Sequence, residues 1–323
     1  MAFLQDKFRL ASLSVDEVCT VLRNLDLGKY EAGFRAVPVD GAIFSTVNDD
    51  GLREMGMDVG VLRTALLHRV SGFRAEGVAL KLLVEAGGAP PDETTEAGGV
   101  PPETVESEAA KSRVQGSKDV GLIISLMGAH KSSVGVQEAG CVSLIMIVAG
   151  NAESQAATAA QGGVEAVLGA MGAHESIAIV QQWGCFALVN LAANAENKGA
   201  IAAKGGIVAV LRAMGAHASS AGVQEYGCWA LGNLAGNVEN AVAIAAQGGI
   251  TAVLRAMGAH GPSAIVQEKG CWALHTIAWP DSGLRSQVRD AAAVPLVQKA
   301  LAAFPGAVDL QEHGKGLLEK LSA

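Results

Sequence analysis

The chain has 323 residues, of which 50% are apolar and 4% aromatic, with 40 glycines, 5 cysteines and a formal net charge of −8. The acidic balance argues against nucleic-acid binding, and no apolar run approaches the roughly 18–20 residues that span a bilayer. The first seven residues lack the basic and apolar regions of a signal peptide, and the few cysteines fit a reducing compartment. We therefore expect a cytoplasmic protein, with the nucleus as the alternative.

The N-terminal segment has the pattern of a small helical unit. Ser14 and Glu17 form a capping box at a helix start, and residues 59–76 are predicted to form a long final helix. Residues 14–76 resemble a sterile alpha motif (SAM) domain, although Leu13 and Val21 stand where tryptophans are common in that family. The resemblance is carried by Leu22, Leu25, Tyr30, Phe34, Val39-Asp40-Gly41, Asp50-Gly51-Leu52 and Met55-Gly56-Met57. It implies a five-helix bundle.

The SAM resemblance also implies self-association between unlike surfaces of two copies. The acidic surface would consist of Asp40, Asp49, Asp50 and Glu54, and the basic surface of Arg63, His68 and Arg69. Such head-to-tail pairing is heterologous and would build rings or open filaments. Ordinary solvated charge is the alternative. Binding of RNA is disfavoured, because residues 1–81 carry ten basic and eleven acidic residues and therefore no dense basic patch.

A short acidic stretch separates this unit from the rest of the chain. Residues 82–110 hold seven acidic and no basic residues, so that seven of the eight net negative charges lie there. The same stretch contains Pro90-Pro91 and Pro101-Pro102 together with two Gly-Gly pairs. One-signed charge with Pro and Gly predicts an acidic, Pro/Gly-rich linker over residues 82–112, disordered or extended.

A repeat of 43 or 44 residues dominates the C-terminal part. Gly-Cys pairs begin at residues 140, 184, 227 and 270, and the triplet Gly-Ala-His begins at residues 128, 172, 215 and 258. Within one period, hydrophobic spacing predicts helices over Asn197–Lys204, Ile207–Met214 and Val223–Ala235, with glycines at the corners. A three-helix unit of about 40–47 residues is typical of armadillo and HEAT arrays.

The third of these helices favours an armadillo array over a HEAT array. The segment 223–235 resembles the third helix of an armadillo repeat, and the composition looks most like the armadillo regions of large leucine-rich-repeat kinases. We therefore predict an all-α chain, in which the SAM bundle precedes an armadillo-type α-solenoid of about four to five repeats over residues 115–323. In the last unit Lys315 and Gly316 replace the recurring cysteine and aromatic residue, which indicates a terminal cap.

The armadillo resemblance implies a peptide-binding groove along the third helices. In armadillo proteins that bind extended peptides, a Trp and an Asn four residues later line the concave face, and this spacing puts both on one side of the helix. The matching residues, which we call the groove row, are Phe186, Asn190, Trp229, Asn233, Trp272 and Thr276. One turn earlier stand Glu225 and Glu268, whose carboxylates would favour a basic ligand. The alternative is that the tryptophans only pack the array and the carboxylates are solvated.

The recurring cysteines and histidines are predicted to be structural. Equivalent positions on stacked helices are roughly 10 Å apart, too far for a disulfide or for one shared metal ion. We expect the cysteines to be small core side chains. The histidines, which should lie at helix ends where the dipole favours them, are His130, His174, His217 and His260.

Together these features predict a non-catalytic adaptor or scaffold in signalling. The SAM unit would self-associate or recruit a partner, while the array would bind other proteins, including basic extended peptides. No cofactor, metal or nucleic acid is expected, and no catalytic constellation is recognisable at a known spacing. The alternatives are a regulatory subunit or fragment of a larger signalling enzyme, and SAM-mediated RNA or lipid binding.

Overall fold

The structure is a computed structural model that describes residues 104–115 and 117–322, together with residues 7–8, 18–19, 22, 32, 34, 44, 52 and 78–79. The chain divides into two units, Met1–Gly99 and Val100–Ala323, which are described separately. All seven residues predicted for SAM association lie outside the described residues: Asp40, Asp49, Asp50, Glu54, Arg63, His68 and Arg69.

Six described positions of the first unit are helical and fully buried: Val18, Cys19, Leu22, Phe34, Phe44 and Leu52. The rings of Phe34 and Phe44 meet edge to face with 5.9 Å between their centroids, an arrangement that the aromatic quadrupoles favour. The short strand β1 (Lys7–Phe8) pairs antiparallel with β2 (Val78–Ala79), which the sequence did not predict. The five-helix SAM bundle stays a prediction.

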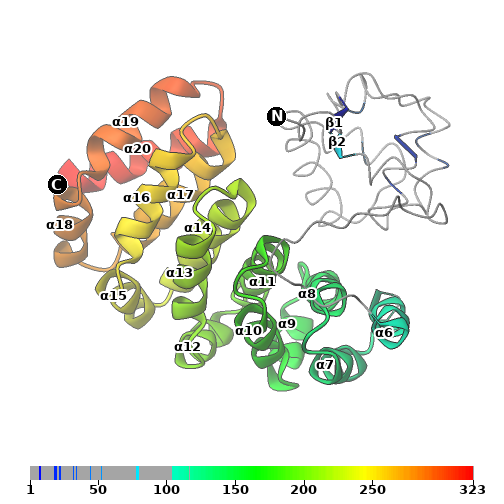
Figure 1. Cartoon of the computed structure of the whole chain (residues 1–323). Coiled ribbons are helices and arrows are strands. Elements are labelled where there is room, and N and C mark those ends of the chain that lie inside the picture. Colours follow the sequence, from blue (N-terminus) through cyan, green and yellow to red (C-terminus); the bar gives the residue numbers. More distant parts are fainter. Residues whose placement is uncertain are drawn as a thin grey trace. The chain divides into compact units, whose positions relative to one another are not determined.

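Helices of three recurring kinds make up most of the described part of the second unit, and the earliest repeat has only its second and third helices (Figure 1). The first helices are α9 (Ala152–Ala160), α12 (Ala195–Ala203), α15 (Val238–Ala246) and α18 (Ser282–Asp290). The second helices are α7 (Val120–Ala129), α10 (Gly163–Ala173), α13 (Gly206–Ala216), α16 (Gly249–Ala259) and α19 (Ala293–Ala303). The third helices are α8 (Val134–Val148), α11 (Ala178–Leu191), α14 (Ala221–Ala235), α17 (Ala264–Ile277) and α20 (Val308–Ser322). The third helices pack on one another in chain order, which makes the repeats one continuous array.

Helix α6 (Val105–Gln115) overlaps the segment predicted as a linker, so the array begins before the predicted residue 115. It packs against α8 and buries Ala110 and Val114. The Ser143 hydroxyl of α8 donates a hydrogen bond to the Val114 carbonyl over 3.1 Å. The acidic residues of its first turn, which composition assigned to a linker, lie where the helix dipole favours negative charge. Helix α6 thus covers the side of α8 that a preceding third helix would cover.

Gly-Gly pairs form the corners between first and second helices. The first glycine has φ between 83° and 91°, in the left-handed region that favours glycine, at Gly162, Gly205 and Gly248. A Cβ on the second glycine would lie 2.8 Å from the carbonyl oxygen five residues earlier, at Gly163, Gly206 and Gly249. The last repeat places Ala292 at the same corner with φ 63°, a strained conformation for a residue with a side chain. The predicted corner role is therefore confirmed for the Gly-Gly pairs. The glycine of each Gly-Ala-His triplet, which was expected to close the second helix, instead lies inside it, as Gly215 does in α13, where His217 is the C-cap.

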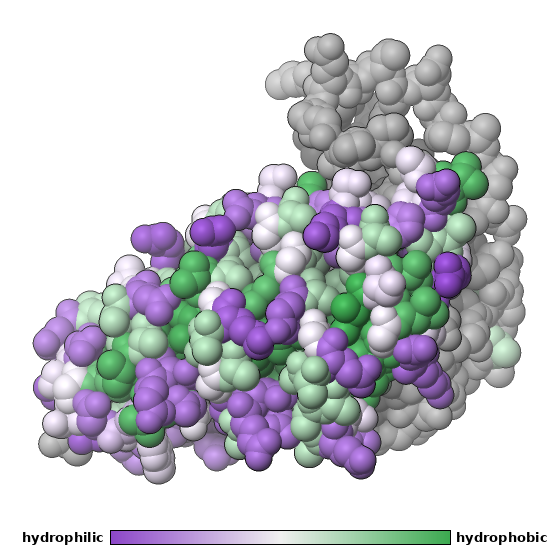
Figure 2. Space-filling model, turned by 90° about the horizontal axis from the view of Figure 1, so that it is seen from below, coloured by the Kyte–Doolittle hydropathy of each residue, from purple (hydrophilic) through white to green (hydrophobic). Residues whose placement is uncertain are grey.

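The face of the array shown in Figure 2 carries hydrophilic residues throughout, with hydrophobic residues gathered in several separate clusters. Large apolar side chains that are exposed include Val208, Val238 and Val242. Within the described part of the chain, no single helix has the length and apolar character needed to cross a membrane. Two sharply bent pairs, α12 with α13 and α15 with α16, reach that length and composition only when each pair is taken together.

Candidate peptide-binding surface

The groove row lies on three neighbouring third helices. It comprises Phe186 and Asn190 on α11, Trp229 and Asn233 on α14, and Trp272 and Thr276 on α17. Because these helices contact each other in this order, the row is continuous. Phe186 is buried and the other five side chains are half-buried. The row therefore presents partly accessible aromatic and amide groups.

Four aromatic side chains form a cluster where α11 meets α14. Phe186 stacks on Tyr226 with 4.4 Å between ring centroids and an interplanar angle of 16°, and its centroid lies 5.7 Å from that of Trp229. The ring centroid of Trp183 lies 6.3 Å from the ring centroids of both Phe186 and Tyr226. Rings in such offset or tilted arrangements attract one another beyond their burial. Trp183 and Tyr226 were not predicted as part of this surface, although each stands three residues before a groove-row aromatic and hence on the same helix side.

The groove-row amides are bonded to the backbone of the array itself. Asn233 Nδ2 donates to the Val189 carbonyl of α11 over 2.8 Å, so it links two repeats. Asn190 Nδ2 donates to the Phe186 carbonyl, four residues earlier, over 2.9 Å. Because an amide has two N–H donors and a carbonyl oxygen, each Asn retains capacity for a ligand backbone. The bond from Asn233 also holds its side chain in one orientation.

The predicted carboxylates are not solvated acids. Glu225 is only 3% exposed. Glu268 forms an ion pair with Lys269 over 2.5 Å, and both side chains are 17% exposed. Lys269 Nζ also lies 4.4 Å from the centroid of the Trp229 ring. A cation at this distance over a Trp face is attracted by the ring quadrupole. Lys269 therefore contacts both the Glu268 carboxylate and the Trp229 ring.

A row of glutamines that was not predicted from the sequence joins second and third helices. Each side-chain Nε2 donates to two carbonyls at the end of the preceding second helix, over 2.8–3.1 Å. The glutamines are Gln137, Gln181, Gln224, Gln267 and Gln311. The last carbonyls of a helix have no partner within it, and these side chains supply one. The signal was present as a Gln three residues before each recurring glycine.

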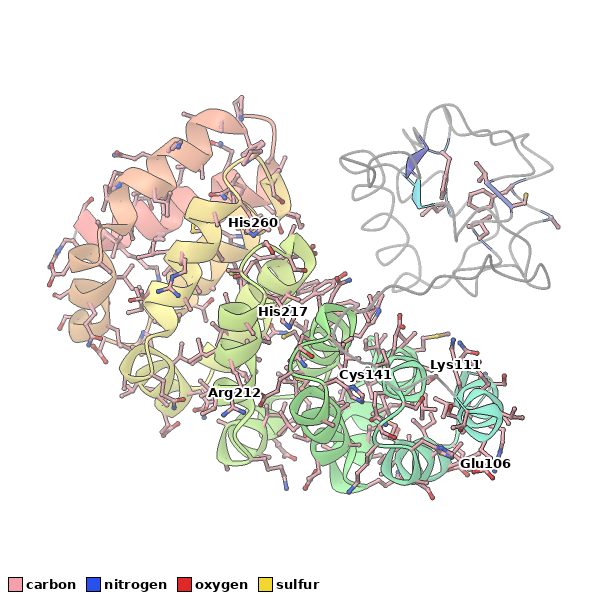
Figure 3. All side chains as sticks on the ribbon, viewed as in Figure 1. Glu106, Lys111, Cys141, Arg212, His217 and His260 are labelled. Carbon is pink, nitrogen blue, oxygen red and sulfur yellow. The ribbon has the colours of Figure 1, made fainter. Side chains whose placement is uncertain are left out.

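The recurring histidines lie at the ends of second helices and also join neighbouring repeats. Nε2 of His174, His217 and His260 lies 2.8 Å from the carbonyl oxygens of Lys131, Glu175 and Ala218, respectively. A carbonyl oxygen only accepts, so Nε2 carries the proton in each ring. Figure 3 shows His217 and His260 at the same corner of successive repeats. Among the described residues no group of three or more His, Cys, Asp or Glu could hold a metal ion.

The cysteines of the repeats are buried and free, as predicted for core residues: Cys141, Cys185, Cys228 and Cys271. Burial raises the pKa of Cys141 and of Cys185 to about 12, because desolvation disfavours the thiolate. Since the thiolate is the reactive form, these thiols are inert at physiological pH.

A second aromatic group lies where α17 meets α20. The ring centroid of His313 lies 6.4 Å from that of Trp272 and 6.5 Å from that of His275. Trp279, just after α17, is 63% exposed, and Lys320 Nζ lies 3.0 Å from its ring centroid. Burial, Lys320 and His313 lower the pKa of His275 to about 4, so this imidazole is neutral at physiological pH.

No protein-family model matches the chain, and no curated protein matches it significantly. Solved structures do match. The designed armadillo repeat protein YIII(Dq)4CqI is 17% identical with a TM-score of 0.57, and the match covers 67% of this chain and 91% of that chain. The array has an armadillo-like repeat fold.

Two further structures have the same likeness. The designed armadillo repeat protein YIII(Dq.V1)4CPAF, solved in complex with peptide (KR)4, is 16% identical with a TM-score of 0.56 and coverage of 67% of this chain and 91% of that chain. An engineered protein from a structural genomics consortium is 23% identical with a TM-score of 0.57, over 67% of this chain and 90% of that chain. The predicted solenoid is thus confirmed at the level of the fold.

Proposed function

We propose that this protein is a non-catalytic interaction scaffold whose groove row binds an extended peptide. The observation that carries the proposal is the row of aromatic side chains on three consecutive third helices, accompanied by an amide on α11 and on α14, with Asn233 oriented by its bond to the Val189 carbonyl. An amide so placed pairs with both the donor and the acceptor of an extended backbone. A neighbour with the same fold was solved with the basic peptide (KR)4. The aromatic walls and Glu268 support a short basic segment as the ligand.

Replacing Trp229 or Asn233 by Ala is expected to weaken binding of the probe peptide (KR)4 to the full chain about tenfold. The tryptophan supplies the aromatic wall and the asparagine a backbone contact, so each loss acts on the ligand directly. Fluorescence anisotropy of the labelled peptide measures the dissociation constant. Asn237→Ala is the matched control, because Asn237 caps the first helix α15 and lies outside the groove row. Unchanged affinity in both groove-row variants would contradict the proposal.

The first unit is proposed to be a SAM domain that self-associates through the acidic set Asp40, Asp49, Asp50 and Glu54 and the basic set Arg63, His68 and Arg69. The resemblance of residues 14–76 supports this, as do the buried helical positions between Val18 and Leu52. Self-association would array several peptide-binding surfaces and raise the apparent affinity through effective concentration.

Light scattering of the full chain should show a mass that grows with concentration. The variant Arg63→Glu should abolish this growth, because it reverses the charge of the basic set opposite an acidic partner surface. Arg255→Glu makes the same charge change at an exposed position on α16 and serves as the control. A monomeric mass at every concentration for the unmodified chain would rule out assembly.

A further inference from the structure

Lys269 lies at the centre of the groove row, between the aromatic and the carboxylate that a basic ligand would use. Its Nζ lies 4.4 Å from the Trp229 ring centroid and 2.5 Å from Glu268 Oε1. Trp229 belongs to α14, whereas Lys269 and Glu268 belong to α17. An aromatic face beside a carboxylate is the environment that binds a Lys or Arg side chain. Here the chain's own lysine occupies that environment.

The geometry shows that Lys269 bends toward this position. Adjacent residues on a helix point about 100° apart and do not normally face each other. Glu268 and Lys269 nevertheless meet, and their charged ends converge near the Trp229 ring. The corresponding position, two residues after the recurring glutamine, holds an aromatic in the two preceding repeats, Trp183 and Tyr226. The cationic occupant is therefore a feature of this repeat.

A second lysine on the same array has a similar contact. Lys320 of α20 places Nζ 3.0 Å from the ring centroid of Trp279, which follows α17. In both pairs the lysine comes from the third helix of one repeat and the tryptophan from the repeat before it. Contact between a tryptophan and a lysine of the next repeat therefore occurs twice in the array, at Trp229 and at Trp279.

We propose that Lys269 is a built-in competitor that occupies the site for a basic side chain of the peptide and so limits the affinity of the groove row for basic ligands. The proposal rests on the proposed peptide-binding function and names its specificity-determining residue. An incoming Lys or Arg must displace Lys269 from Trp229 and Glu268, or bind a neighbouring part of the row. Removing the Lys269 side chain frees both partners for the ligand without removing any other groove-row contact.

The test measures the affinity of (KR)4 for the full chain by fluorescence anisotropy, with Lys269→Ala and Lys269→Arg. Lys269→Ala is expected to bind three- to tenfold more tightly, roughly the value of one partly exposed cation–π contact. Lys269→Arg should bind no more tightly than the unmodified chain, because Arg is at least as good an occupant of a Trp face. Lys299→Ala is the control: it makes the same change in net charge at an exposed position on α19.

Three results would overturn the proposal. Equal affinities of Lys269→Ala and Lys299→Ala for (KR)4 would show that only the net charge of the chain changes binding. Weaker binding of (KR)4, or loss of binding to the acidic peptide (ED)4, in Lys269→Ala would make Lys269 a ligand contact. With any of these results, loss of (KR)4 binding in Trp229→Ala would still support the proposed function. If no variant and no unmodified chain binds either peptide, the proposed function fails together with this inference.

Discussion

Replacing Gln224 with Ala should lower the free energy of unfolding by about 3 kcal/mol. Gln224 is 3% exposed and donates to the carbonyls of Met214 and His217, each over 2.9 Å. The His217 carbonyl keeps the Ser220 N–H as a partner, whereas the Met214 carbonyl loses the only side-chain donor it has. A buried acceptor without a partner costs about 1–3 kcal/mol, and the lost side chain also leaves a void at the helix contact.

Urea unfolding followed by circular dichroism measures this effect. The control is Gln298→Ala, which removes a glutamine exposed on α19 and should change the free energy of unfolding by less than about 0.5 kcal/mol. If both variants unfold at the same urea concentration, the glutamine row contributes nothing to the corner between second and third helices.

Replacing Gly227 with Ala should destabilise the array by about 1–2 kcal/mol, because overpacking outweighs the gain in helix propensity. A Cβ on Gly227 would lie 2.5 Å from Met214 Cγ and 2.8 Å from its sulfur. Gly140, Gly184 and Gly270 face the equivalent methionines in the same way. The glycine of each Gly-Cys pair is therefore the point where a second helix rests on a third helix.

The matched comparison is Gly215→Ala, the same chemical change one helix earlier. A Cβ on Gly215 meets nothing within 4 Å, so this variant should gain about 0.5–1 kcal/mol from helix propensity. Combining Gly227→Ala with Met214→Ala should cost less than the two single changes added together, since the clash disappears with the Met side chain. Thermal unfolding of the four variants and the parent completes the cycle; additive effects would refute the contact.

Much of the array was predictable because its determinants are local. The helix ends expected for residues 197–235 lie within two residues of those of α12, α13 and α14. Gly205 adopts a left-handed φ of 87°. A Cβ on Gly206 would lie too close to the carbonyl oxygen five residues earlier, so this position also requires glycine. Requirements that arise within one turn recur with every repeat and appear as a period of 43 or 44 residues.

The groove row was only half predictable. Its aromatic and amide residues are implied by the armadillo resemblance, and their spacing of four puts them on one helix side. Their partners lie elsewhere: Asn233 bonds to Val189, 44 residues earlier, and Lys269 reaches Trp229 from the next repeat. Glu225 and Glu268 were expected as a solvated or ligand-facing row, but one is buried and the other is paired. Side chains of this length reach several neighbours, and the distance between helices selects among them.

Sequence alone determined that this chain contains a glycine-punctuated helical repeat, because steric limits at corners and helical periodicity act on neighbouring residues. Only the tertiary structure decided that α6 belongs to the array, that glutamines join its second and third helices, and that a lysine covers Trp229. These features depend on contacts between residues distant along the chain. Burial and hydrogen bonding reward such contacts only after the helices have packed, so no local pattern specifies them.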